Sequence, residues 1–299
     1  MSSNYRGAGA AIVTPFHKEG QIDFKSFEKL IEHLIGNGIR YIVFMGTTGE
    51  SVTLNHDEKQ AIISMAVELV DSRVPVVIGV GGNNTQEVVN NLRCIDFDGV
   101  DAIMSVSPYY NKPQQKGIYL HFKTIAGICP VPVIIYNVPS RTGSNITAET
   151  TLQLAHEVPN IIAIKEASRD MVQCSRIIRD KPKDFLVISG DDVTALPFMA
   201  LGGDGVISVI ANALPSEFSA MVNYCLEGNF GAARELNMKL LDITETIYAE
   251  GSPSGIKALL YSQGLCQNAV RLPLVKVSKT LQLNLANLLK SFETVPMKG

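Results

Sequence analysis

The chain of 299 residues lacks the signatures of several protein classes. Its five cysteines are widely spaced and form no C-x-x-C pair, which argues for reduced thiols and against a disulfide framework or structural zinc. The five histidines are scattered in the same way and show no metal-ligand spacing, so no metal is expected. A formal charge of -3 provides no basic surface for nucleic acid, so no nucleic-acid partner is expected.

Long apolar segments are also missing. No apolar run approaches the length needed to cross a bilayer, and the opening residues MSSNYRGAGA contain no signal-peptide core. Together with the dispersed cysteines, this predicts a cytoplasmic protein without a membrane partner. Hydrophobic residues make up 46% of the chain, which suffices for a large core with one barrel-sized domain and an appendage.

Strand and helix patterns alternate eight times before about residue 226. The expected strands span residues 8–15, 41–45, 76–80, 102–106, 133–136, 161–166, 185–188 and 205–209. Amphipathic segments between them predict helices, for example at 85–97, 115–128 and 147–156. This order predicts an α/β fold, a (β/α)8 TIM barrel over residues 1–225. The alternative, an open doubly wound sheet, would need a G-x-G-x-x-G turn after the first strand, and residues 8–15 offer none.

No strand pattern follows residue 214. Residues 229–249, 253–263 and 278–292 have helical spacing, and the last carries a leucine stripe of the kind that packs against other elements. We expect residues 226–299 to form a C-terminal helical domain that packs on the barrel or on another subunit.

Lys165 ends the apolar run Ile161-Ile162-Ala163-Ile164, which is typical of a strand buried on both faces. Burial removes the hydration of an ammonium and lowers its pKa from about 10.4. A neutral lysine is a nucleophile that forms imines with carbonyl compounds. Taken alone, such a residue is more often a lysine that extends from a strand end into solvent, and the rest of the chain must favour the reactive amine.

Other unusual residues follow the expected strands. They are Thr47, Thr48, Tyr109, Tyr110, Tyr136, Arg141 and Gly190. Each has an ordinary explanation as a turn, packing or surface residue. In a barrel, however, the carboxyl ends of the strands share one rim, where active sites form. The glycines that flank Thr47 and Thr48 would let backbone N–H groups approach an anion such as a substrate carboxylate.

Five motifs together resemble one family. They are Gly46-Thr47-Thr48-Gly49-Glu50 with Leu54-Asn55-His56-Asp57-Glu58, Pro108-Tyr109-Tyr110-Asn111, the segment 136–143, Ile164-Lys165-Glu166-Ala167, and Ser189-Gly190-Asp191-Asp192. Over nearly its whole length the chain is similar to dihydrodipicolinate synthases of the pyruvate-dependent class I aldolase family, which includes N-acetylneuraminate lyase. The resemblance implies condensation of pyruvate with L-aspartate-4-semialdehyde in the diaminopimelate and lysine pathway.

The resemblance also implies catalytic roles. Lys165 would form a covalent imine with C2 of pyruvate and supply the electron sink, so that no separate cofactor is needed. Tyr136 would donate and accept protons through Thr47 and Tyr110, with Tyr110 coming from the neighbouring subunit of a tight dimer. A homotetramer built from such dimers is the expected assembly.

Substrate binding follows from the same resemblance. Thr48 and Ile207 would hold pyruvate through backbone groups, Gly190 belongs to the same pocket, and Arg141 would bind the carboxylate of the aldehyde substrate. Where the family often has Asn-Pro, this chain has Ser252-Pro253, which alters details of the second substrate's pocket.

A regulatory site for lysine is a further implication. The matching positions are Ser51, Val52, His56, Lys59, Asn83, Glu87 and Tyr109. Lys59 departs from strongly regulated relatives, which have histidine or glutamate there. Since a second ammonium disfavours a cationic ligand by an energy on the order of 1 kcal/mol, we expect weak inhibition or none.

Two alternative functions remain open at this point. A sugar-acid aldolase or N-acetylneuraminate lyase would use the same imine, but such relatives usually lack the arginine at position 141. A catalytically silent barrel that serves as a binding protein would be expected to lose Lys165, Tyr136 or Thr47, and the chain retains all three.

Overall fold

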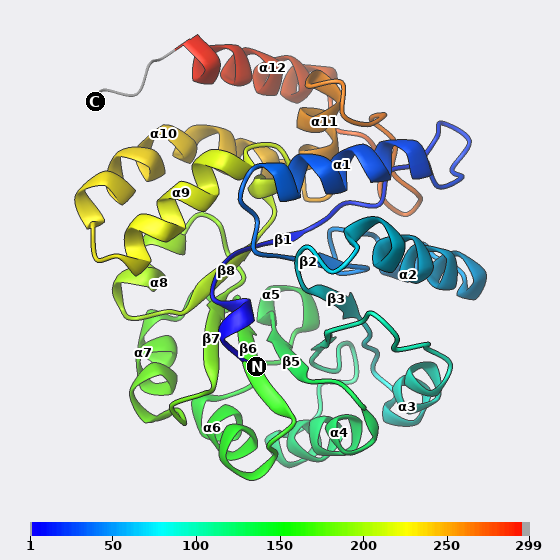
Figure 1. Cartoon of the computed structure of the whole chain (residues 1–299), viewed down its shortest axis with the longest axis vertical. Coiled ribbons are helices and arrows are strands. Elements are labelled where there is room, and N and C mark those ends of the chain that lie inside the picture. Colours follow the sequence, from blue (N-terminus) through cyan, green and yellow to red (C-terminus); the bar gives the residue numbers. More distant parts are fainter. Residues whose placement is uncertain (1, 295–299) are drawn as a thin grey trace.

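Eight parallel strands close into a barrel in sequence order (Figure 1). The computed structural model describes residues 2–294. The strands are β1 (Gly7–Ala11), β2 (Tyr41–Phe44), β3 (Val76–Gly79), β4 (Ala102–Val106), β5 (Val133–Asn137), β6 (Ile161–Glu166), β7 (Leu186–Ser189) and β8 (Gly205–Ser208). β1 pairs with β8 as well as with β2, which closes the ring and confirms the predicted (β/α)8 barrel.

Helices surround this barrel (Figure 1). The α-helices of the barrel region are α1 (Phe24–Gly36), α2 (His56–Val70), α3 (Thr85–Arg93), α4 (Gln115–Ile128), α5 (Pro139–Thr142), α6 (Ala148–Glu157), α7 (Met171–Asp180), α8 (Ala195–Ala200) and α9 (Pro215–Leu226). Within the described residues, three short 3-10 helices span Ser2–Tyr5, Ser51–Thr53 and Ile210–Asn212. The C-terminal part of the chain forms α10 (Phe230–Tyr248), α11 (Ser254–Ser262) and α12 (Lys279–Thr294).

Two element boundaries, those of β1 and α3, differ from the expectation by more than two residues. β1 ends at Ala11, since the backbone N–H of Val13 leaves the sheet and donates to the Asn212 side chain at 3.1 Å. The helix expected over 85–97 ends at Arg93, and Ile95 and Phe97 pack against the core from the loop beyond it. The sequence predicted a longer helix because Ile95 and Phe97 are apolar at helical spacing, and both pack on the core from the loop.

The amino end of the barrel is filled by aromatic side chains. The rings of Tyr5 and Tyr41 meet edge to face with centroids 5.6 Å apart, and the Tyr5 hydroxyl donates to the carbonyl of Asp101 at 3.0 Å. A Cβ on Gly9 would lie 2.4 Å from the Tyr41 ring, so the glycine is what lets this ring occupy the interior. Side chains thus pack the amino end, while the functional residues gather at the carboxyl end.

A buried ion pair joins the C-terminal helices to the β2–α2 loop. Lys257 on α11 is fully buried and its ammonium contacts the Glu50 carboxylate. The same carboxylate accepts from the backbone N–H of Arg271 at 3.0 Å, and Lys257 also donates to the carbonyl of Ala269 at 2.9 Å. A buried charge pair survives only when further hydrogen bonds satisfy it, and here they do. Glu50 directly follows the Gly46–Gly49 loop, so α11 helps to fix that loop.

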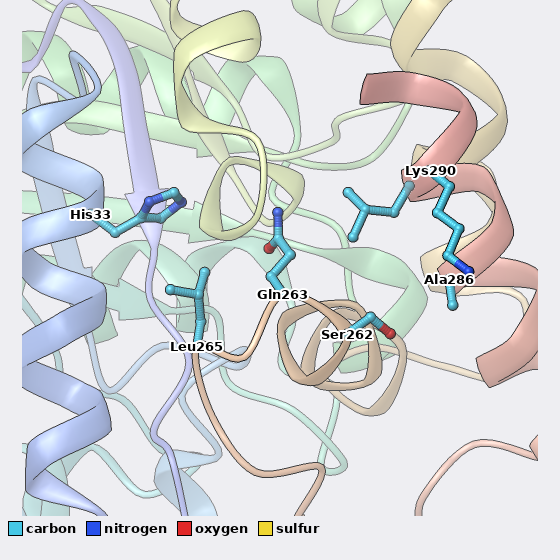
Figure 2. A pocket seen from close by; sticks show the side chains of 7 residues that line it. His33, Ser262, Gln263, Leu265, Ala286 and Lys290 are labelled. Carbon is cyan, nitrogen blue, oxygen red and sulfur yellow. The ribbon is translucent and has the colours of Figure 1, made fainter. Parts of the chain in front are cut away.

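A cavity of about 510 Å³ lies away from the strand ends, between α1, α11 and α12. Figure 2 shows His33 on one side, Gln263 and Leu265 between the helices, and Ala286 and Lys290 on α12 opposite. Burial lowers the pKa of the His33 imidazole, which favours its neutral form. This cavity shares no lining residue with the cavity at the strand ends.

Candidate active site

A cavity of about 390 Å³ opens at the carboxyl ends of the barrel strands. Its walls come from the loops after β2, β5, β6, β7 and β8 and from the end of α10. The lining residues are Thr47, Thr48, Tyr136, Val138, Ser140, Arg141, Lys165, Ala167, Ser168, Arg169, Gly190, Asp191, Val209, Tyr248 and Ser252. Six of the eight residues predicted to act on substrate line this cavity, and Tyr110 and Ile207 do not.

Lys165 lies within this cavity as a buried amine, with only 5% of its surface exposed. It is the fifth residue of β6 and shares the orientation of Ala163, which lies in the barrel interior. Burial lowers the pKa of the Lys165 ammonium to about 8, the Asp192 carboxylate opposes that shift, and the Arg141 guanidinium adds to it. The neutral fraction of the amine near pH 7 to 8 is therefore far larger than that of an ordinary lysine, and imine formation requires the neutral form.

Tyr136 stands directly beside the lysine. The register of β5 and β6 pairs Tyr136 with Lys165, and the Lys165 Nζ lies 4.4 Å from the centroid of the Tyr136 ring. Burial raises the pKa of the Tyr136 phenol, while the Arg141 charge and a hydrogen bond with the Thr47 side chain act in the opposite direction. The phenol stays protonated at neutral pH and is positioned to exchange a proton with a group bound to the lysine.

Asp192 and Tyr248 form a buried hydrogen bond beside the cavity that the sequence alone did not indicate. The Tyr248 hydroxyl donates to the Asp192 carboxylate at 2.7 Å, and the backbone N–H groups of Val209 and Ile210 donate to it at 3.0 Å. Burial raises the pKa of the Asp192 carboxyl, and these donors act against the rise. Asp192 belongs to the Ser189–Asp192 motif, but its contact with α10 spans 56 residues of sequence and has no local signal.

Gly190 leaves space for the Lys165 side chain in the cavity, and Arg141 adds a positive charge to the cavity wall. A Cβ on Gly190 would lie 2.9 Å from Cε and 3.1 Å from Cγ of Lys165, so only glycine leaves the lysine stem its space. Arg141 on α5 is exposed, and its Nη2 lies 3.4 Å from the carbonyl of Ser252. Most of the guanidinium fork thus remains available for a carboxylate, next to the position where the chain departs from the family's Asn-Pro.

Ile207 lies on β8 beneath the cavity. Its side chain is only 1% exposed and packs inside the barrel, while Val209, two residues later, reaches the cavity wall. A substrate role for Ile207 would therefore use its backbone, as the sequence comparison implied.

Tyr110 lies outside this chain's own cavity. It is 88% exposed and has a positive φ of 71°, an uncommon conformation for a bulky residue. A second cavity of about 300 Å³ adjoins the first and shares Thr47, Tyr136, Val138 and Arg141 with it. Val52, which is 82% exposed, also lines this second cavity. Apolar and aromatic groups thus project beside an open side of the site.

The positions assigned to lysine regulation divide into two groups. Ser51, Val52 and Tyr109 line the second cavity, and the Asn83 side chain donates to the Tyr109 carbonyl at 3.2 Å. His56 and Lys59 lie in the first turns of α2, and Glu87 lies in the first turn of α3. Of these positions, Ser51, Val52, Asn83 and Tyr109 therefore lie together at the second cavity or beside it.

Within residues 2–294, no group of three or more His, Cys, Asp or Glu side chains is arranged to hold a metal ion. In the same part of the chain, every helix is too short or too polar to span a membrane.

Similarity to known proteins shows the family to which the chain belongs. The sequence profile of the "Dihydrodipicolinate synthetase family" matches residues 4–292. The chain belongs to this family. It is 49% identical over 275 residues to a 4-hydroxy-tetrahydrodipicolinate synthase of Flavobacterium psychrophilum, which covers 92% of this chain and 94% of the relative. Members named 4-hydroxy-tetrahydrodipicolinate synthase are lyases that act in lysine biosynthesis through the diaminopimelate route, as the resemblance of the motifs implied.

Solved structures share the fold over almost the whole chain. A monomeric dihydrodipicolinate synthase variant has a TM-score of 0.95 at 36% identity and covers 98% of this chain and 99% of its own. The dihydrodipicolinate synthase of Cyanidioschyzon merolae, solved with lysine bound, has a TM-score of 0.94 at 35% identity and the same coverage. Family members therefore include both a monomeric variant and a lysine-binding enzyme.

Proposed function

We propose that this chain is a 4-hydroxy-tetrahydrodipicolinate synthase that condenses pyruvate with L-aspartate-4-semialdehyde through an imine on Lys165. The observation that carries the proposal is the buried amine of Lys165, with its pKa lowered to about 8, beside Tyr136 at the carboxyl end of the barrel. An amine desolvated in this way is a nucleophile near neutral pH.

The first half of the reaction consumes pyruvate. The Lys165 amine adds to C2, the carbonyl oxygen leaves as water, and a protonated imine remains. This cation withdraws electrons, so that a methyl proton leaves to the relay of Tyr136 and Thr47 and an enamine forms. In the proposed dimer, Tyr110 of the neighbouring subunit completes the relay to solvent.

The second half joins the two substrates. The enamine carbon attacks the aldehyde of L-aspartate-4-semialdehyde, and the new oxyanion takes a proton from the same relay. The substrate amino group then adds to C2, and the Lys165 amine leaves to give 4-hydroxy-tetrahydrodipicolinate. Because the lysine serves as the electron sink, the proposed reaction uses no separate cofactor.

Two anchors distinguish the substrates. Backbone groups at Thr48 and Ile207, beside Gly190, hold the pyruvate carboxylate deep in the cavity. Arg141 at the entrance binds the carboxylate of the aldehyde substrate through its planar fork. An arginine at this place favours an amino-acid aldehyde over the polyol of a sugar-acid aldolase.

We also propose a homotetramer built from dimers, with the dimer as the smallest active unit. The exposure of Tyr110 and Val52 beside the second cavity supports a partner at that face, since large exposed apolar groups mark interaction surfaces. The partner's copy of this loop would then place its tyrosine near Thr47.

For regulation we propose that lysine inhibits weakly or not at all. Ser51 and Tyr109 line the second cavity and Asn83 donates to the Tyr109 carbonyl, but Lys59 adds a positive charge to the predicted cleft. Turnover measured against lysine tests this, and strong inhibition at submillimolar lysine would contradict it.

Borohydride reduction in the presence of pyruvate is the decisive experiment for the imine. Mass spectrometry of the digested protein should find the reduced adduct on the peptide that carries Lys165. The Lys165→Ala variant should give no adduct and no turnover while keeping its fold. An adduct on another lysine would overturn the proposal.

A further inference from the structure

Asn137 and Glu166 immediately follow the two residues at the centre of the site. The register of β5 and β6 pairs Tyr136 with Lys165 and then Asn137 with Glu166. Since successive side chains of a strand point to opposite faces, the first pair lies inside the barrel and the second pair outside. Each catalytic group is thus one peptide unit away from a member of a second cross-strand pair.

The outer pair is joined by direct hydrogen bonds. The Asn137 Nδ2 donates to both carboxylate oxygens of Glu166 at 3.0 Å, and the Asn137 Oδ1 accepts from the backbone N–H of Ile146 at 2.9 Å. Glu166 also accepts from the Gln173 Nε2 at 2.9 Å and from the backbone N–H of Ser168 at 2.7 Å. Asn137 is 0% exposed and Glu166 only 2%, so water does not compete for these contacts.

The chemistry of the contacts requires a carboxylate at position 166. All three neighbours present N–H groups, and a carboxylate is the side chain that only accepts. A glutamine there would direct its own N–H₂ toward at least one of these donors. Burial raises the pKa of the Glu166 carboxyl, and the three donors counteract that rise. Buried polar networks of this kind specify one geometry when every member is satisfied.

The pair also holds the backbone at the edge of the cavity. The N–H of Ala167 donates to the Asn137 carbonyl at 2.9 Å, and the N–H of Gly190 donates to the Glu166 carbonyl at 2.8 Å. Ala167 and Gly190 both line the cavity, whereas the lining found among the described residues includes neither member of the pair. Asn137 and Glu166 therefore act behind the wall and do not touch substrate.

We propose that Asn137 and Glu166 are positioning residues that hold Tyr136 and Lys165 at the spacing needed for proton transfer to and from the substrate imine. The inference rests on the proposed function of Lys165 and Tyr136 and deepens it. Loss of the outer pair frees β5 and β6 to shift at their carboxyl ends, and a displacement of about 1 Å between reacting groups costs on the order of a hundredfold in rate.

The test compares two steps in the Glu166→Gln variant. Imine formed with pyruvate is quantified by borohydride trapping, and methyl proton removal is quantified by exchange of pyruvate methyl hydrogens in deuterium oxide. The exchange rate per trapped imine should fall at least tenfold. A purely structural role would lower both signals in proportion to the folded fraction and leave their ratio unchanged.

Two further variants sharpen the result. In Asn137→Asp/Glu166→Gln the carboxylate and the amide exchange places, so that a donor again meets an acceptor between positions 137 and 166. The Gln173 Nε2 still faces an amide at position 166, so the ratio should recover only in part. Glu149→Gln on the exposed face of α6 removes one carboxylate elsewhere and should leave the ratio unchanged. If Glu166→Gln does not fold, Glu166→Asp keeps the charge but shortens the reach to Asn137, and its ratio should fall as well.

The outcomes separate the two ideas. A normal exchange ratio in a folded Glu166→Gln or Glu166→Asp protein, with imine trapped in the unmodified protein, overturns the positioning role and leaves the proposed function standing. Absence of any trapped imine in the unmodified protein overturns the proposed function, and the positioning role falls with it.

Discussion

Lys165 and Tyr136 are cross-strand neighbours whose side chains meet inside the barrel, with the Lys165 Nζ 4.4 Å from the centroid of the Tyr136 ring. The face of the ring attracts the ammonium, while burial favours the neutral amine. Burial prevails, because the pKa of Lys165 is lowered to about 8. The protein thus keeps the amine available to a carbonyl at a pH where an ordinary lysine is almost fully charged.

The first prediction concerns pH. Imine formation with pyruvate should accelerate about tenfold per pH unit below the pKa of about 8 and level off above it, because only the neutral amine attacks. Asp192→Asn removes the carboxylate that raises this pKa and should move the midpoint to lower pH. Rapid-mixing kinetics with borohydride quenching measures both curves. A midpoint near the unperturbed 10.5 would show that the amine is not desolvated.

Gly190→Ala should reduce turnover without unfolding the protein. The added methyl would lie 2.9 Å from Cε of Lys165 and 2.9 Å from Cβ of Ala167, so the lysine stem must move. We expect kcat to fall roughly ten- to a hundredfold, as for a displacement of about 1 Å at a reacting group. Gly127→Ala on α4, where nothing lies within 4 Å of the new Cβ, is the matched control and should keep full activity. Equal activity of the two variants would contradict the steric argument.

Arg141→Ala should raise KM for L-aspartate-4-semialdehyde far more than KM for pyruvate. A charge-assisted carboxylate contact contributes about 1.5–3 kcal/mol, which corresponds to roughly ten- to a hundredfold. Arg141→Lys keeps the charge without the planar fork. Its KM for L-aspartate-4-semialdehyde should lie between that of the unmodified protein and that of Arg141→Ala. Steady-state kinetics with each substrate varied in turn measures the split. Parallel increases for both substrates would refute separate anchors.

Tyr110→Phe should lose most of its activity if the neighbouring subunit supplies this hydroxyl. When Tyr110→Phe protein exchanges subunits with Lys165→Ala protein, each heterodimer should contain one site with both the lysine and the tyrosine. Activity should then rise above the small residual activity of Tyr110→Phe, while Lys165→Ala alone has none. Native mass spectrometry confirms the exchange. Silent mixtures with confirmed heterodimers would mean that each site is built from one chain.

The last prediction concerns stability. Lys257→Met leaves the Glu50 carboxylate buried without its counter-charge and should reduce the free energy of unfolding by about 3–5 kcal/mol. Glu50→Gln added to Lys257→Met removes the second charge and should recover a large part of the loss. Denaturant unfolding of the single and double variants measures both values. A double variant that is less stable than Lys257→Met would contradict this account.

Local patterns explain why the strands and the lysine could be predicted. Apolar runs such as 161–164 leave few options besides a buried strand, and a residue at the end of such a run must lie at the rim of the barrel. Lys165 and Tyr136 were placed correctly for this reason. The helix after residue 85 was predicted too long because Ile95 and Phe97 pack on the core from a loop.

The remaining features depend on contacts that a local pattern does not record. Asp192 meets Tyr248 across 56 residues, and Glu50 meets Lys257 across 207. Neither pair has a sequence spacing from which the contact could be predicted. The role of Tyr110 rests on the proposed dimer, and the division of the chain at residues 225 and 226 stays a prediction.

The contact between Glu50 and Lys257 has a consequence for synthesis on the ribosome. The loop with Thr47 and Thr48 emerges early, but its partner Lys257 follows 207 residues later and Arg271 follows 221 residues after Glu50. At about 5–20 residues per second, the delay before Lys257 appears is roughly 10–40 s. A nascent chain with all eight strands translated still lacks the cation that neutralises Glu50. The loop with Thr47 and Thr48 therefore gains its contacts with Lys257 and Arg271 only after α11 and the segment beyond it emerge, which ties the final form of the cavity to synthesis of the C-terminal helices.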